Sequence, residues 1–139
     1  MTRFLTLADV ERVCFEYARA RLTHDEPIPS FDSRFPSKLE SAIEAPQRSY
    51  DGKLLYETFE RQAALLFYEL IKLHPFLNGN KRIATVSLMV FLSLNGKWIK
   101  TEWKELYDIA ITVAESKPEN RDGILGLLEE FIKNKIVPA

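Results

Sequence analysis

Residues 83–94 read IATVSLMVFLSL and form the longest apolar-rich stretch of the chain, with Thr85, Ser87 and Ser93 as its only polar residues. A helix with almost no polar face is buried, so this stretch predicts a central helix that begins within Asn78 to Lys81 and ends near Leu94. Its 12 residues are far fewer than the roughly 20 that a membrane span requires, so we expect a soluble protein without a membrane partner.

Helical spacing of apolar residues on both sides of this stretch predicts more helices, at residues 7–22, 37–45, 54–73, 101–115 and 118–135. Thr6 and Thr101 are the expected N-caps of the first and fourth of these. No strand pattern is convincing, although Lys97 to Lys100 fits a short extended piece. The predicted fold class is therefore all-α, and a length of 139 residues fits one domain over 1–139.

Composition and charge exclude several functional classes. The net charge is −1 and no run of lysine and arginine forms a stripe, so we expect no nucleic-acid partner. One cysteine and two histidines cannot supply a disulfide or the usual zinc cluster, and a cytoplasmic location is the default. Cys14 lies on an apolar stripe and is interpreted as a core residue, whereas His24 lies in a polar loop and receives no role.

Residues 47–53 contain Asp51-Gly52, a dipeptide that favours a tight turn. Two interpretations stay open for this segment. It closes a short β-hairpin, or it is a plain connector between two helices. Local sequence alone slightly favours the connector.

Residues 74–82, which read HPFLNGNKR, concentrate chemically useful side chains before the central helix. Backbone N–H groups at a helix N-terminus are unpaired and carry about half a positive charge. Gly79 allows a ligand to approach the backbone, and Lys81 and Arg82 add full charges, so the segment predicts an anion site suited to phosphate. His74 precedes it closely enough to act as a general base.

Each of these residues also has a simpler structural interpretation. Asn78 or Asn80 fits an N-cap, His74 fits a core histidine, and the two cations fit a solvated first turn. Cations at a helix N-terminus oppose the helix dipole, however, which makes that last role unfavourable. Taken together, the cluster favours the anion site.

The same nine residues resemble the signature of the Fic/Doc family, HxFx(D/E)GN(G/K)R, at His74, Phe76, Gly79, Asn80, Lys81 and Arg82. Lysine before the arginine is similar to the Doc ("death on curing") toxin branch, because Fic enzymes proper carry glycine there. The resemblance covers roughly residues 37–96. It implies a bundle of about six helices that uses ATP or another nucleoside triphosphate and Mg²⁺.

In that resemblance His74 would be the general base for a target hydroxyl, and Gly79, Asn80, Lys81 and Arg82 would hold the phosphates. The family's flap, which aligns a target peptide by strand addition, would be Arg48, Ser49, Tyr50, Asp51, Gly52 and Lys53. The resemblance also implies an antitoxin protein that inhibits the toxin in trans. Translation elongation factor Tu is the best-known target of Doc toxins.

Two positions depart from the family pattern. Asn78 stands where the family usually has an acidic magnesium ligand, so Asn78 would supply an amide oxygen and no negative charge. Thr85 stands where AMP-transferring Fic enzymes place a further arginine. We also find no self-inhibitory Ser/Thr-x-x-x-Glu-Gly/Asn stretch, so inhibition is expected to come from another chain.

The leading hypothesis is therefore a toxin kinase that moves a phosphoryl group from ATP to a Ser or Thr hydroxyl of a target protein, such as a translation factor. AMP transfer is the alternative within the same superfamily. A non-catalytic helical module that binds a nucleotide is the alternative of a different class, and Asn78 keeps it open.

Overall fold

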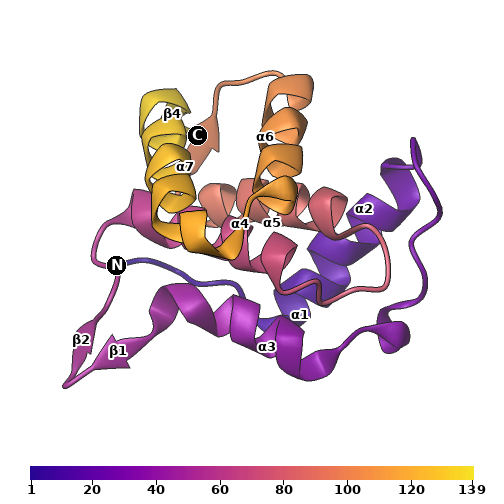
Figure 1. Ribbon diagram of the computed structural model, residues 1–139, viewed down its shortest axis with the longest axis horizontal. Helices are drawn as coiled ribbons and strands as arrows, with labels where there is room; N and C mark the ends of the chain where they lie inside the picture. The colour runs from indigo at the N-terminus through magenta and orange to yellow at the C-terminus, as the bar shows by residue number, and fades with distance from the viewer.

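The computed structural model describes residues 1–139, and α-helices make up most of it (Figure 1). The helices are α1 (Leu7–Asp9), α2 (Glu16–Arg21), α3 (Pro36–Glu44), α4 (Phe59–Lys72), α5 (Asn80–Leu94), α6 (Trp103–Glu115) and α7 (Arg121–Lys135). A π-helical segment, η1 (Val10–Phe15), joins α1 to α2, and the 3-10 turns are η2 (Phe31–Ser33), η3 (Ala45–Gln47) and η4 (Pro118–Asn120). The predicted all-α class is confirmed.

Helices α4 and α5 form the centre of the fold. α5 packs against α4, α6 and the N-terminal helical run, and α4 also contacts α3, η3, α6 and α7. In Figure 1, α6 and α7 stand above this pair and α3 runs below it. The buried hydrophobic side chains form one continuous cluster, to which α5 contributes Ile83, Ala84, Val86, Leu88, Phe91 and Leu92. The apolar stretch therefore occupies the predicted central position.

The first helix begins where the sequence predicts. Thr6 is its N-cap: the Thr6 hydroxyl accepts from the Asp9 N–H at 3.1 Å, and the Asp9 carboxylate accepts from the Thr6 N–H at 3.0 Å. Both orphan donors are thus satisfied by a reciprocal capping box. Cys14 is fully buried, as its place on the apolar stripe predicts.

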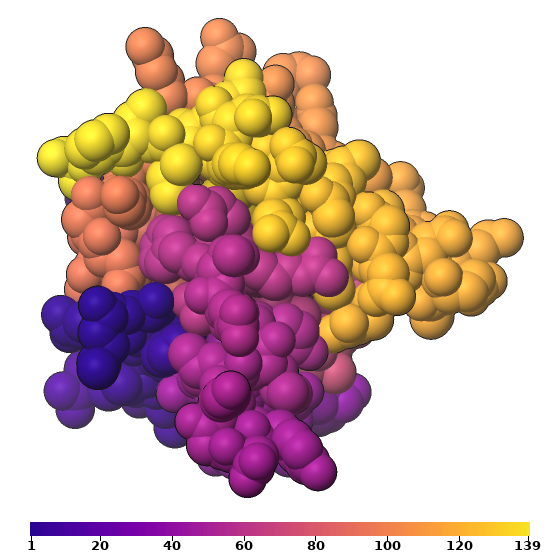
Figure 2. Space-filling view, turned by 90° about the vertical axis from the view of Figure 1, so that its left-hand side faces the viewer, coloured from indigo at the N-terminus to yellow at the C-terminus, as the bar shows by residue number.

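The hairpin interpretation of residues 47–53 is correct. β1 (Ser49–Tyr50) pairs antiparallel with β2 (Lys53–Leu54), and the turn residues Asp51 and Gly52 have φ values of 52° and 79°. Positive φ at both central positions is what a type I′ turn requires. The hairpin extends from the body at the lower left of Figure 1, and the magenta segment that includes it forms the lower part of the face shown in Figure 2.

Three sequence expectations were wrong in detail. Helix α4 starts at Phe59 rather than near residue 54, because Leu54 pairs in the hairpin and Thr58 provides the N-cap. The N-cap of α6 is Glu102, since the Thr101 hydroxyl bonds the Glu105 carboxylate.

The third concerns strands. The short extended piece expected at Lys97 to Lys100 is a strand, β3 (Lys97–Ile99), but the sequence did not indicate its antiparallel partner, β4 (Ile136–Pro138) at the C-terminus. No helix of the fold is both long enough and apolar enough to cross a membrane.

Candidate active site

The segment between α4 and α5 is a tight loop held by its own side chains. The Phe76 N–H donates to the Asn80 Oδ1 at 2.9 Å, and the Asn80 Nδ2 donates to the Phe76 carbonyl at 2.8 Å. The Phe76 ring lies in the core, with its centroid 5.6 Å from that of Phe15 and 6.1 Å from that of Phe31. Asn80 thus ties the loop together, and Phe76 anchors it.

His74 is exposed at the end of α4 and has a φ of 56°. This left-handed conformation is uncommon for a residue with a Cβ atom, and after a helix C-terminus it is usually adopted by glycine. Backbone strain of this kind concentrates at functional sites. The conformation therefore supports a role for the imidazole beyond packing.

Gly79 is required by its surroundings as well as by its backbone. Its φ is 84°, and a Cβ atom there would lie 2.6 Å from the Cγ1 atom of Ile28 and 2.8 Å from its Cδ1 atom. Ile28 is buried beneath the loop. The segment before η2 therefore supports the loop from below, a contact that no local sequence signal indicates.

Asn78 also contacts this segment. Its Nδ2 donates to the carbonyls of Glu26 and Pro27, each at 3.3 Å, and its Oδ1 accepts from the Gly79 N–H at 2.8 Å. The amide nitrogen thus fixes the loop to the segment below it. The Oδ1 atom retains a second lone pair for another partner.

Arg82 points away from the loop surface. Its side chain is almost fully buried, and its Nη1 and Nη2 atoms donate to the carbonyls of Leu22 and Glu26, both at 2.7 Å. Burial raises the pKa of the Tyr107 phenol, and the positive charge of the nearby Arg82 guanidinium group partly opposes this shift.

The loop encloses a small hollow of about 70 Å³. Its lining consists of Ile71 of α4, Ala114 of α6 and six residues of the loop and the start of α5, namely His74, Leu77, Asn78, Gly79, Asn80 and Lys81. Five of the six residues expected to act in catalysis, metal binding or phosphate binding are therefore brought together, and Arg82 is the one that does not line the hollow.

The first turn of α5 has unpaired backbone N–H donors. Its first helical hydrogen bond runs from the Ile83 N–H to the Gly79 carbonyl at 2.9 Å, so the N–H groups of Asn80, Lys81 and Arg82 have no partner within the fold. Three N–H dipoles and the Lys81 ammonium group thus give this end of α5 a positive potential. No group of three or more His, Cys, Asp or Glu side chains forms a metal cluster anywhere in the fold.

The hairpin lies at the opposite end of α4 from His74. The 14 residues of α4 span about 21 Å, and in Figure 1 the hairpin extends away from the bundle. The expected flap residues all lie in or beside this hairpin. Ser49, Tyr50 and Lys53 are exposed in its strands, Asp51 and Gly52 form its turn, and Arg48 directly precedes β1.

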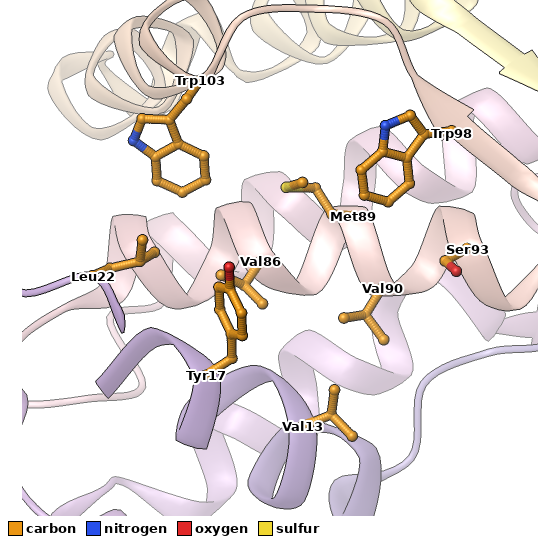
Figure 3. Close-up of a pocket in the computed structure, with 9 residues that line it drawn as sticks. All are labelled: Val13, Tyr17, Leu22, Val86, Met89, Val90, Ser93, Trp98 and Trp103. Carbon is orange, nitrogen blue, oxygen red and sulfur yellow. The ribbon is translucent and has the colours of Figure 1, made fainter. Parts of the chain in front are cut away.

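A second, larger hollow of about 530 Å³ lies on the outer side of α5 (Figure 3). In Figure 3, Trp98 and Trp103 lie on one side of it and Tyr17 on the other, with Met89 and Val90 of α5 between them. Its lining is almost entirely apolar and contains none of the loop residues, so it is distinct from the polar hollow at His74.

Comparison with known proteins identifies one family. The model of the Fic/DOC family matches residues 7–92, which is more than half of the chain and includes the whole His74 loop. Neither the curated proteins nor the solved structures include a match. A matched segment of this extent, with the loop and helix N-terminus described above, shows that the chain belongs to the Fic/DOC family, whose members are generally enzymes of nucleotide-dependent protein modification.

Proposed function

We propose that this protein is a Doc-type kinase, which transfers the γ-phosphoryl group of ATP to a Ser or Thr hydroxyl of a target protein. The observation that carries the proposal is the hollow in which His74 and Lys81 lie beside the unpaired N–H groups of α5. A base and an anion site within one small hollow are the two parts that phosphoryl transfer to a hydroxyl requires.

The phosphates would lie against the N-terminus of α5. The N–H groups of Asn80 and Lys81 are unpaired. The missing side chain of Gly79 leaves room for Ile28 below the loop, so the loop backbone can lie in the position that the phosphates would need. The half-buried Lys81 supplies a full charge there. Because the Asn80 side chain is occupied by Phe76, we assign its backbone rather than its amide to the phosphate.

In the transfer step the target hydroxyl oxygen attacks the γ-phosphorus and a new P–O bond forms. The bond from that phosphorus to the β–γ bridging oxygen breaks, so ADP leaves. His74 accepts the hydroxyl proton and later releases it to solvent. Lys81 and the α5 N–H groups stabilise the negative charge of the transferring group.

Magnesium fits this site only as an ion that the nucleotide brings. The hollow has no carboxylate, and its side-chain oxygens are the Oδ1 atoms of Asn78 and Asn80, each of which accepts one hydrogen bond within the loop. Asn80 is buried, whereas Asn78 is half-buried and more accessible. Mg²⁺ commonly combines few protein ligands with phosphate oxygens and water. We therefore propose Asn78 Oδ1 as the protein ligand, and the ion would supply charge neutralisation of the phosphates.

Thr85 favours phosphoryl transfer over AMP transfer. The Thr85 side chain is buried, and its hydroxyl donates to the Lys81 carbonyl one turn earlier, at 2.7 Å. The position where AMP-transferring relatives carry an arginine thus offers no cation to a distant γ-phosphate. This supports an orientation in which the γ-phosphate lies beside His74. AMP transfer remains the alternative that the experiment below separates.

The target and the inhibitor are proposed from the resemblance to Doc toxins. A peptide that pairs with the exposed β1–β2 hairpin would have to continue along α4 for about 21 Å to bring its hydroxyl to His74. Elongation factor Tu is the proposed target. An antitoxin protein acting in trans is the proposed inhibitor. Expression of the chain alone should arrest bacterial growth, and His74→Ala should relieve the arrest. Unimpaired growth with catalytically active protein would contradict the toxin role and leave the kinase activity standing.

The decisive experiment supplies a cell extract with ATP labelled at either the α- or the γ-phosphate. We expect labelled protein from the γ-label only, and loss of labelling in His74→Ala. The matched control is His24→Ala, which removes the other histidine, an edge-on neighbour of Tyr107 with a centroid distance of 5.3 Å. Labelling from the α-phosphate would establish AMP transfer instead. Binding of ATP with neither label transferred would identify a non-catalytic module.

A further inference from the structure

Arg82 is the one cation of the loop that does not face the hollow. It is 2% exposed, and both of its hydrogen bonds go to backbone carbonyls of the segment 22–28. Both distances are 2.7 Å, which is short for an N–H···O bond and typical of a charged donor. No carboxylate is paired with Arg82, so these carbonyls are the partners that its buried charge has.

The segment 22–28 is connected to the His74 loop at three points. Arg82 binds the carbonyls of Leu22 and Glu26, Asn78 binds that of Glu26 again, and Ile28 lies directly under Gly79. The Arg82 Nη2 atom is also 3.6 Å from the position of a Cβ at Gly79. The guanidinium group therefore lies below the loop, between the segment and the start of α5.

Moving Arg82 toward the phosphates would remove the donor of the Leu22 carbonyl, leave the Glu26 carbonyl with only the longer bond from Asn78, and open a space under Gly79. Both lost bonds have a charged donor and are costly to break, so the arginine is held where it is. Lys81, one residue earlier, lines the hollow and has no competing partner in the fold. The two adjacent cations therefore have different surroundings on opposite sides of the helix start.

We propose that Arg82 is a positioning residue, which fixes the His74 loop by clamping it to the segment 22–28, and that Lys81 alone supplies the side-chain charge that contacts the phosphates. The role of Lys81 in contacting the phosphates rests on the proposed function. The role of Arg82 in fixing the loop does not depend on it. The position of the His74 loop is thus fixed by its contacts with a segment about 50 residues earlier in the chain.

The test compares Arg82→Lys with Lys81→Met, with Arg61→Lys as a matched control because Arg61 pairs with Glu129 away from the loop. Lys81→Met should weaken Mg-ATP binding about tenfold or more and reduce its salt dependence, with an unchanged melting temperature. Arg82→Lys keeps the charge, but an ammonium group cannot reproduce the two hydrogen bonds that the planar guanidinium group donates. It should speed amide exchange in residues 22–28 and 74–79 and lower kcat by about 100-fold, with the wild-type salt dependence of Mg-ATP binding.

Two further measurements apply if Arg82→Lys does not fold. Ile28→Ala loosens the same segment without touching any cation, and it should likewise speed amide exchange across residues 74–79. In the wild-type protein, the guanidinium N–H signals of Arg82 should exchange slowly and stay unchanged when Mg-ATP is added. Faster exchange of these protons on nucleotide binding would show that Arg82 leaves its carbonyls for the phosphates and would overturn the proposal.

The outcomes also separate the inference from the proposed function. If the wild-type protein does not bind Mg-ATP, the proposed function fails, whereas the amide exchange of Arg82→Lys and Ile28→Ala still decides whether the clamp exists. If Mg-ATP binds and neither variant changes exchange in the loop, the clamp fails while the kinase proposal stands.

Discussion

Asn80 and Phe76 form a reciprocal pair: each of the two polar atoms of the Asn80 side chain is bonded to the Phe76 backbone, at 2.9 Å and 2.8 Å. Both residues are buried, and the pair closes the loop that carries His74. An asparagine at position 80 is therefore needed to hold the conformation of the loop, because its amide offers both a donor and an acceptor to the Phe76 backbone.

The Asn80–Phe76 pair can be tested by substitution. Asn80→Ala leaves the Phe76 N–H and carbonyl unsatisfied in a buried place, so we expect a loss of about 1–3 kcal/mol in the free energy of unfolding. Asn80→Asp keeps the acceptor but sets a carboxylate against the Phe76 carbonyl, so it should be at least as destabilising. Denaturant melts of the three proteins measure both. Wild-type stability in both variants would refute a structural role for the pair.

His74 has a left-handed backbone conformation, which favours glycine. Because its φ is 56°, glycine should be more stable than alanine at this position, by about 1 kcal/mol. His74→Gly and His74→Ala both lack the imidazole and should be equally inactive, with a rate loss of about 10²–10⁴-fold. Urea unfolding combined with the labelling assay checks both statements. Equal stability of the two variants would show that the left-handed conformation carries no strain.

Asn78→Asp is expected to act in two opposite directions. Aspartate restores a charged oxygen, so the Mg²⁺ concentration needed for half-maximal nucleotide binding should fall. It also removes the Nδ2 donor and sets a carboxylate beside the carbonyls of Glu26 and Pro27, so the melting temperature without Mg²⁺ should fall as well. Superimposable Mg²⁺ titrations of the two proteins would mean that position 78 does not touch the metal.

Cys14 should make stability fall at alkaline pH. Burial raises the pKa of the Cys14 thiol to about 11, above its value in the unfolded chain. The unfolded thiol therefore releases its proton first, so the contribution is complete below the unfolded pKa and is lost as pH rises through the folded pKa. The free energy of unfolding should decline between about pH 9 and pH 11, and Cys14→Ala should decline less. Identical pH profiles would show that the thiol is not shielded.

Local signals in the sequence determined the helices, the loop and the side chains at its surface. The buried α5 follows from its continuous apolar composition, and the Thr6 cap from short-range hydrogen bonding within one turn. The HPFLNGNKR segment indicated an anion site beside a histidine, and His74 and Lys81 do line one hollow. These features depend on residues close together in the chain, which is why a pattern of a few residues reveals them.

The tertiary structure alone decided what each motif residue contacts. The sequence grouped Lys81 and Arg82 as two phosphate-binding cations, yet the fold directs Arg82 to carbonyls about 60 residues away. It also set the start of α4, through the hairpin pairing of Leu54, and it paired β3 with β4 across 36 residues or more. Such contacts join segments distant in the chain, and their energies depend on burial and packing that exist only once the helices have assembled.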